Sequence, residues 1–218
     1  ELIKNKLTTV QRLELSSDYI TEGHALKGVL KADMENIRST MEKIDYNTFE
    51  DVVNNIFAAK RIYIIGLRSS MALAEFLGFY LNIILQNVKT VGYGISDIFE
   101  QMINVGEGDL VIGIGFPRYA SRTIDALAFA QDRGATVVAV TDSFLSPLAA
   151  RADYSLIAQS NMASFVDSLV APLSVINALI IAVGMREKEN ISSTFNSLEE
   201  IWREYNVYSY NNRNVGDD

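Results

Sequence analysis

The spacing of apolar residues along the chain changes at about residue 60. Before that point, apolar side chains recur every three or four residues, which is typical of amphipathic helices. The first such stretch is His24–Ile44, and a second begins at Asn47, with Glu50 completing a capping-box pattern. Two consecutive amphipathic helices predict a helical arm, residues 23–58, that packs on the domain or on a partner subunit.

From Arg61 onward, short runs rich in β-branched residues alternate with helix-like segments. This alternation is typical of βαβ units, which build a parallel sheet with helices on both faces. Because crossovers between parallel strands are right-handed, the pattern predicts a doubly wound, five-stranded α/β domain of flavodoxin-like order, 2-1-3-4-5. We expect strands at residues 61–65, 87–91, 110–114, 135–141 and 154–158.

The segments between and after these strands are predicted to be helical. The helix at Thr123–Arg133 is expected to end at Gly134, since glycine commonly follows a helix end. A long apolar helix is expected to begin at a capping box formed by Ser164 and Asp167, and we expect it to bury surface between subunits together with the arm. Further helices are expected at about 69–85, 95–102, 164–185 and 193–205. The polar tail, 209–218, is expected to be disordered, which leaves 59–208 as the main domain.

Composition narrows the classes of function. The formal net charge is −8, which argues against nucleic-acid binding by these residues alone, because phosphate contacts need clustered Lys and Arg. The chain has no cysteine and a single histidine, His24, so neither a zinc site nor a disulfide framework is expected, and we expect no cofactor. With no evident signal peptide or membrane span, the expected location is the cytoplasm.

Two strand-to-helix turns are candidate binding sites. They are Gly66–Ser70 and Gly113–Thr123, and both hold hydroxyls and arginine. In the predicted strand order, strands one and three are neighbours, so both turns flank one crevice at the carboxyl ends of the strands. Free N–H groups at helix N-termini and arginine side chains suit a phosphate or carboxylate. However, such turns need small capping residues in any case, so the pattern alone leaves a structural role equally open.

The same turns carry a family resemblance. Arg61–Ser70 and Gly108–Pro117 resemble the first and second phosphosugar loops of sugar isomerase (SIS) domains. The helical arm, with the segment from Phe165 to Leu179, resembles RpiR-type transcriptional regulators in particular. The series is completed in the usual order by residues 130–134, 137–142, 146–149 and 152–153.

The resemblance implies a regulator whose SIS domain senses a phosphorylated sugar or a sugar acid. In that family a helix-turn-helix domain precedes the SIS domain, so residues 1–22 are expected to be the end of such a domain or a linker. DNA would then be bound only through the preceding domain. A homodimer or tetramer is expected, with ligand binding shifting the arrangement of its subunits.

The resemblance also implies ligand-binding residues. Ser69, Ser70 and Arg118 are the first candidates, and Arg68, Tyr119, Ser121 and Thr123 are the second group. The sequence departs from the family here. Arg68 stands where the family usually has glycine. The second loop, usually Ser-x-Ser-Gly-x-Thr, has Gly115, Pro117, Arg118 and Ala120 at those positions, so three hydroxyls are absent.

Two other functions stay open from the sequence. A sugar-phosphate (aldose–ketose) isomerase would need a positioned base, for which Glu75 and Glu100 are candidates. His24, on the arm, is more typical of a surface or packing residue. The third alternative is a module that only dimerises.

Overall fold

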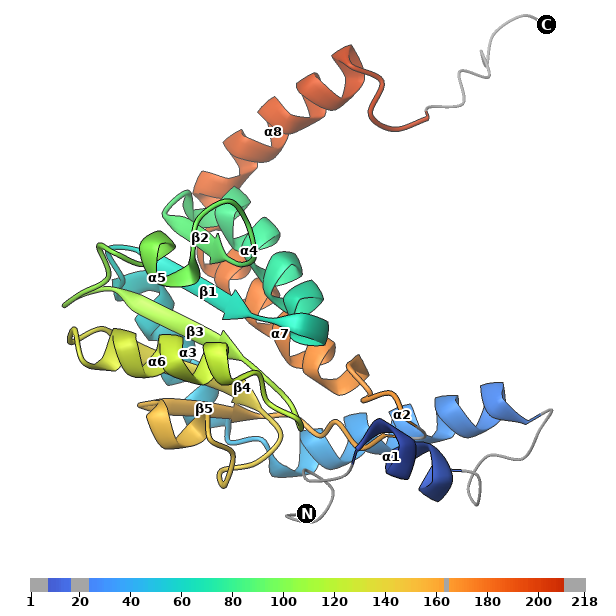
Figure 1. The fold of residues 1–218 in the computed structure, drawn as a ribbon. Helices are drawn as coiled ribbons and strands as arrows, with labels where there is room; N and C mark the ends of the chain where they lie inside the picture. Colours follow the sequence, from blue (N-terminus) through green and yellow to red (C-terminus); the bar gives the residue numbers. More distant parts are fainter. Residues whose placement is uncertain (1–7, 17–23, 163–164, 210–218) are drawn as a thin grey trace, which may run out of the picture.

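A five-stranded parallel sheet forms the centre of the protein (Figure 1). The computed structural model describes residues 8–16, 24–162 and 165–209 of the 218-residue chain. The strand order is β2-β1-β3-β4-β5, so the predicted fold class and strand order are confirmed. The strands are β1 (Ile62–Gly66), β2 (Val88–Val91), β3 (Leu110–Ile114), β4 (Thr136–Thr141) and β5 (Tyr154–Ile157).

Helices cover both faces of this sheet (Figure 1). One face is covered by α3, α4 and α7, and the other by α5 and α6. The α-helices of the described residues are α1 (Thr9–Ser16), α2 (Ala25–Lys43), α3 (Tyr46–Ala58), α4 (Met71–Leu85), α5 (Ile98–Gln101), α6 (Ser121–Gln131), α7 (Val170–Arg186) and α8 (Lys188–Glu204). Two 3-10 turns, η2 (Arg68–Ser70) and η3 (Ala149–Arg151), follow β1 and β4.

Successive side chains of a strand enter different cores. Ile64 of β1 lies in the core under α3, α4 and α7, whereas Ile65 lies in the core on the opposite face. This follows from the pleat, because neighbouring strand residues point to opposite sides of the sheet. Both side chains are fully buried, which explains why the sequence of β1 is a continuous apolar run rather than an alternating one.

The α2 helix turns its polar side to the domain. Asn36 and Thr40 are buried, while Leu26 and Met34 are 76% and 71% exposed. Asn36 exchanges two hydrogen bonds with the backbone of Asn161, at 2.9 and 3.1 Å. By contrast, α3 buries its apolar stripe against the sheet. The arm therefore packs on the domain through α3 and the polar side of α2, and a partner subunit for the apolar stripe of α2 stays a prediction.

Several helix ends differ from the expected ones. The cap of α3 is Asp45, whose carboxylate accepts from the backbone N–H groups of Asn47 and Thr48, so the capping box expected at Asn47 and Glu50 is wrong. The first turn of α3 therefore begins one residue before Asn47.

The long helix also starts later than predicted. It begins at Val170, and Asp167 pairs with Arg12 instead of capping it. The hydroxyl of Ser168 donates to Asp33 and accepts from the N–H of Val170 at 3.5 Å. Ser164, the other half of the expected capping box, lies outside the described residues. The final helix starts at Lys188 rather than at residue 193, α5 is shorter than predicted, and the predicted disordered tail falls mainly on residues 210–218, outside the described part.

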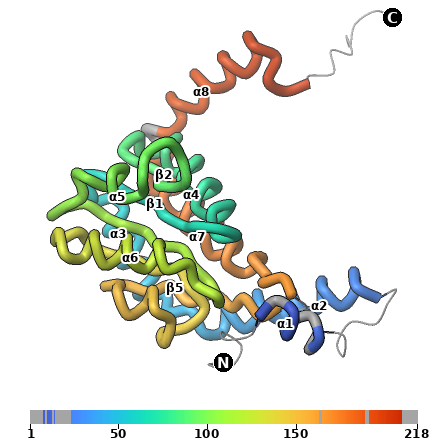
Figure 2. The backbone as a smooth tube through the Cα atoms, in the orientation of Figure 1, coloured from blue at the N-terminus to red at the C-terminus, as the bar shows by residue number. Residues whose placement is uncertain are grey.

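The last helix, α8, extends away from the body of the domain (Figures 1 and 2). It meets α7 at a bend of 108°. In the described part of the chain, no single helix is long and apolar enough to cross a membrane. The bent pair α7–α8 reaches that length and composition only when its two helices are taken together.

Candidate anion-binding site between two strand-to-helix turns

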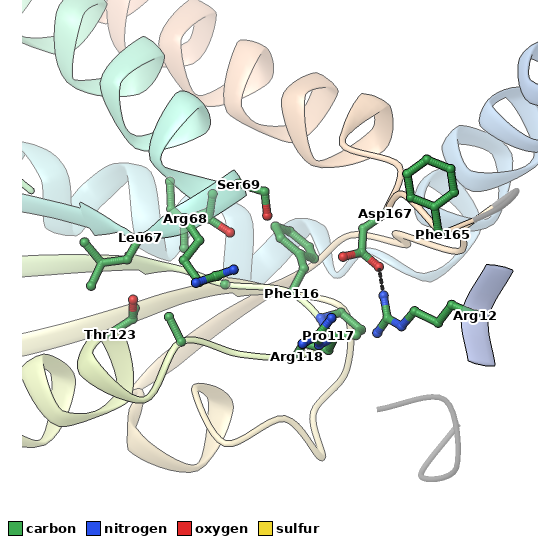
Figure 3. Close-up of a pocket in the computed structure, with 14 residues that line it drawn as sticks. Arg12, Leu67, Arg68, Ser69, Phe116, Pro117, Arg118, Thr123, Phe165 and Asp167 are labelled. Carbon is green, nitrogen blue, oxygen red and sulfur yellow. Dashed lines mark hydrogen bonds and ion pairs between the residues drawn. The ribbon is translucent and has the colours of Figure 1, made fainter. Parts of the chain in front are cut away.

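The turns after β1 and β3 lie side by side and enclose a small cavity. Ile65 of β1 pairs with Gly113 of β3, which brings the carboxyl ends of both strands together. The cavity has a volume of about 160 Å³ (Figure 3). Its described lining residues come from these turns, from α1 and from the segment before α7: Arg12, Leu67, Arg68, Ser69, Ser70, Ile114, Gly115, Phe116, Pro117, Arg118, Ala120, Thr123, Phe165 and Asp167.

Five of the seven predicted ligand-binding residues line this cavity: Arg68, Ser69, Ser70, Arg118 and Thr123. The other two, Tyr119 and Ser121, are not among its lining residues. The hydroxyl of Tyr119 donates to Asp142 at 2.8 Å, and Ser121 is exposed at the start of α6. The structure thus brings together residues from both turns, as the strand order predicts.

Each turn bends at an arginine with a left-handed backbone. Arg68 has φ of +58° and Arg118 has φ of +66°. For a residue with a Cβ atom this region costs roughly 1–2 kcal/mol, and glycine adopts it freely. These are the two positions at which the SIS loops usually have glycine. The chain therefore accepts backbone strain at both turns and places a guanidinium group at each.

The first turn is also tight. A Cβ atom on Gly66 would lie 2.6 Å from the carbonyl oxygen of Ser70 and 3.2 Å from the Cβ atom of Ala74. The absence of a side chain at residue 66 lets the backbone of η2 fold back against the end of β1. The hydroxyl-bearing residues 69 and 70 are thereby held at the start of α4, where free N–H groups and the helix dipole favour an anion.

The cavity is cationic although the chain is acidic. Its charged lining residues are Arg12, Arg68, Arg118 and Asp167, which gives a local formal charge of +2 against −8 for the whole chain. A small recess of one sign attracts and concentrates ligands of the opposite sign. The lining therefore favours an anionic ligand over a neutral one.

Two buried polar atoms at the cavity have no hydrogen-bond partner. They are the Oγ1 atom of Thr123 and the Nε atom of Arg12, and their residues are 1% and 3% exposed. Buried polar groups are almost always paired, so an unpaired one calls for an explanation such as a ligand. Thr123 and Arg12 approach the cavity from different elements, α6 and α1.

The involvement of Arg12 was missed by sequence reasoning. Its Nη1 atom lies 2.8 Å from Oδ1 of Asp167, a residue 155 positions away. Local patterning carries no signal for such a pairing. The one available hint was an arginine among the apolar residues Val10, Leu13 and Leu15.

The acid–base candidates of the isomerase alternative lie elsewhere. Glu75 is exposed on α4 and does not line the cavity. Glu100 accepts from the backbone N–H of Asp97 in the capping box of α5. His24 is exposed at the start of α2. Within the described ranges, no group of three or more His, Asp or Glu side chains is arranged to hold a metal ion.

A second hollow lies at the end of β2. Residues 92–98, Glu100 and Arg122 line it, and its volume is about 450 Å³. Asp97 pairs with Arg122 there. The hydrogen bond from the Phe99 N–H, with that from Arg122, lowers the pKa of Asp97 below its ordinary value. Asp97 is already used by the cap of α5 and by Arg122. None of the buried side-chain atoms without a hydrogen-bond partner in the described residues belongs to the lining of this hollow.

Known proteins share this fold. The SIS domain family profile matches residues 55–182, which is more than half of the chain. The chain belongs to the SIS domain family. The crystal structure of the sugar isomerase domain of an RpiR transcription factor from Sphaerobacter thermophilus is 30% identical, with a TM-score of 0.77 over 81% of this chain and 99% of that one. The resemblance to RpiR-type regulators is therefore confirmed.

Two further proteins extend the comparison. An uncharacterized HTH-type transcriptional regulator of Haemophilus influenzae is 28% identical over 82% of this chain, which spans 62% of that regulator's length. Vibrio vulnificus NanR, solved in complex with ManNAc-6P, has a TM-score of 0.71 at 19% identity and covers 92% of this chain and 76% of its own. At that identity the likeness to NanR shows the fold alone.

Proposed function

We propose that this SIS domain is the effector-sensing and dimerising part of a transcriptional regulator. Its effector is an anionic sugar derivative, a sugar phosphate or a sugar acid, bound in the cavity between the two turns. The observation that carries this proposal is the cationic cavity in an acidic chain, lined by buried polar atoms that have no partner. Relatives named as RpiR-type and HTH-type regulators support the regulatory role.

The arginines and the hydroxyl-bearing residues of the lining are suited to different groups of the ligand. The guanidinium groups of Arg68 and Arg118 bind the phosphate or carboxylate, since Arg forms strong, planar, charge-assisted hydrogen bonds with such groups. The hydroxyls of Ser69, Ser70 and Thr123 bind further ligand oxygens. Pro117 has no backbone N–H to donate, so this second loop relies on side-chain charge more than the usual SIS loop does.

Regulation would follow from the thermodynamic linkage between ligand binding and the arrangement of the subunits. A ligand that binds one subunit arrangement better than another shifts the population toward it by its differential affinity. DNA would be bound in the cytoplasm by a helix-turn-helix domain preceding residue 23, and the spacing of two such domains would report the arrangement of the SIS dimer.

A binding panel tests this proposal. The panel contains ManNAc-6P, glucose 6-phosphate, 6-phosphogluconate and gluconate, with N-acetylmannosamine and glucose as neutral controls. We expect at least one anionic compound to raise the melting temperature and the neutral sugars to have no effect. At 100 times its Kd, a ligand stabilises the folded state by about 2.7 kcal/mol. If none of the anionic compounds binds in calorimetry at millimolar concentration, the proposal is wrong for these sugar classes.

The isomerase alternative is tested by turnover. Asp167 is the one carboxylate among the described lining residues, and it is paired with Arg12. This arrangement favours binding over proton abstraction. We expect no interconversion of aldose and ketose phosphates by NMR at high protein concentration. Measurable turnover that is lost in the Glu75→Gln or Glu100→Gln variant would establish the enzyme instead.

A further inference from the structure

Arg12 occupies an unusual position for a charged residue. It is 3% exposed, whereas Val10 of the same helix is 65% exposed. Of the α1 side chains that the structure describes, the buried one is thus a cation. Taking a guanidinium group out of water is costly unless its charge and its donors are satisfied.

The pairing with Asp167 satisfies that requirement only in part. It joins the Nη1 atom of Arg12 to one carboxylate oxygen at 2.8 Å. The Nε atom is buried and has no acceptor. Figure 3 shows the Arg12 side chain reaching from α1 toward Asp167 at the edge of the residues that line the cavity. Nε therefore remains without an acceptor on a cation that lines the cavity and that Asp167 already holds in place.

We propose that Arg12 is a ligand-binding residue contributed by the N-terminal helix and that Asp167 positions it. This inference rests on the proposed anion site and adds a residue from outside the two turns. The anionic group of the ligand accepts from Nε of Arg12 while Nη1 stays with Asp167. Binding of the anion and docking of α1 on the SIS domain then strengthen each other.

The coupling between anion binding and the docking of α1 can be measured from either side, as a change in affinity or as a change in docking. If Arg12 raises the affinity of the site for an anion by some factor, the anion must strengthen docking of α1 by the same factor. A charge-assisted hydrogen bond is worth about 10-fold or more in affinity. We expect α1 to belong to the end of a DNA-binding domain or to a linker, so ligand binding would change the docking of that segment by the same factor.

The affinity experiment uses the full chain with glucose 6-phosphate, gluconate and inorganic phosphate as separate probes. We expect Arg12→Ala to weaken binding about 10-fold or more. The matched control is Arg38→Ala, which removes the same charge from an exposed site on α2. The phosphate and carboxylate probes distinguish which anion the site accepts.

A double variant separates direct binding from simple neutralisation. Arg12→Ala alone leaves Asp167 as an unpaired negative charge at the cavity, which would repel an anion. Arg12→Ala/Asp167→Ala removes both charges and leaves the local formal charge unchanged. Direct binding predicts that the double variant stays weak. Recovery of wild-type affinity in the double variant would overturn the proposal.

Hydrogen exchange tests the coupling to α1. We expect the amides of residues 9–16 to exchange about 10-fold more slowly when the probe is saturating. This protection should vanish in the double variant. The double variant also replaces Arg12→Ala if that single variant folds poorly. Faster exchange of α1 on binding, or wild-type affinity in the double variant, would show that Arg12 is not part of the site. If no probe binds the wild-type chain, the proposed function itself fails, which is a distinct outcome.

Discussion

Arg68 and Arg118 have the same left-handed backbone in two turns that follow neighbouring strands, with φ of +58° and +66°. Arginine does not favour this conformation, and both arginines line the cavity. Strained residues persist where the surrounding structure determines them, and they gather at functional sites. The shared conformation therefore places backbone strain in both turns of the proposed ligand-binding site.

The first prediction separates the backbone strain of Arg68 from the charge of its side chain. Arg68→Gly and Arg68→Ala should weaken binding of sugar phosphates equally, about 10-fold or more, because both remove the charge. Their stabilities should differ. The glycine variant relieves the strain and should be unchanged or up to about 1 kcal/mol more stable than wild type in urea unfolding, whereas the alanine variant keeps the strain.

Gln86 provides the matched control. It ends α4 with φ of +61°, away from the cavity. Gln86→Gly should likewise preserve or raise stability, yet leave sugar-phosphate affinity unchanged. Equal binding by wild type and Arg68→Gly would remove Arg68 from the site.

The second prediction concerns the unpaired hydroxyl of Thr123. Thr123→Val keeps the shape of the side chain and removes a buried polar atom that has no partner. The ligand-free protein should be as stable as wild type or more stable by up to about 1 kcal/mol, and sugar-phosphate binding should weaken about 10-fold. Calorimetry and urea unfolding measure the two effects.

A paired hydroxyl should behave in the opposite way. Thr40 donates to the carbonyl of Asn36 at 2.8 Å and accepts from the N–H of Gln159 at 2.8 Å. Thr40→Val should destabilise the chain by about 1–3 kcal/mol and leave affinity unaltered. A destabilised Thr123→Val would show that its hydroxyl already has a partner in solution.

The third prediction concerns the tightness of the first turn. Gly66→Ala forces a Cβ atom against the backbone carbonyl of Ser70 and should destabilise the protein by about 1–3 kcal/mol while displacing η2. Gly94→Ala is the control, since its Cβ atom would have no neighbour within 4 Å. Thermal unfolding compares the two, and equal stability would contradict the close approach at Gly66.

The fourth prediction is a pH dependence at the cap of α3. The hydroxyl of Thr48, followed by the N–H groups of Thr48 and Asn47, lowers the pKa of Asp45. A lowered pKa stabilises the fold above the ordinary value of about 3.9, and this stabilisation is lost as pH falls through the folded-state pKa. The melting temperature of Asp45→Ala should therefore lie below that of wild type at neutral pH, with the difference shrinking below about pH 4.

Asp51 offers a comparison on the same helix. It is exposed and lies after the first turn of α3. Asp51→Ala should give a smaller difference in melting temperature at neutral pH. A pH-independent difference for Asp45→Ala would show that the charge of its carboxylate has no part in the cap.

The fifth prediction tests the expected subunit interface. Met34 is 71% exposed in the apolar stripe of α2. Met34→Glu should weaken self-association in sedimentation experiments, because it places a charge in a surface expected to be buried between subunits. Lys27→Ala changes the net charge by the same amount and should leave self-association intact. A wild-type chain that is monomeric at micromolar concentration would contradict the interface.

The strands and their order could be predicted from the sequence because buried parallel strands leave continuous apolar runs. Ile62–Ile65 is an example, since both faces of β1 are covered. The two turns could be placed because strand order alone brings them together. Helix starts were less predictable, since several side chains can cap the same turn, and Asp45 was used instead of Asn47.

The parts of the site that could not be predicted depend on distant contacts. Asp167 fits a capping pattern in the sequence but pairs with Arg12, 155 residues away. Tyr119 fits the ligand loop but turns to Asp142. Sequence patterns describe contacts between residues that are close in the chain. The contacts of Asp167 and Tyr119 are instead made with residues of other elements.

The orientation of α2 leads us to expect that this helix detaches from the domain before the sheet unfolds. Its contact with the domain includes hydrogen bonds of Asn36 and Thr40, whereas its apolar stripe faces away. In a separated protomer little apolar burial would oppose its release, so dilution should melt this helix before the sheet. Asn161, one of its anchors, lies six residues before Asp167 of the cavity. Ligand affinity would then depend on the expected self-association, because a protomer without its expected partner would hold one wall of the cavity less firmly.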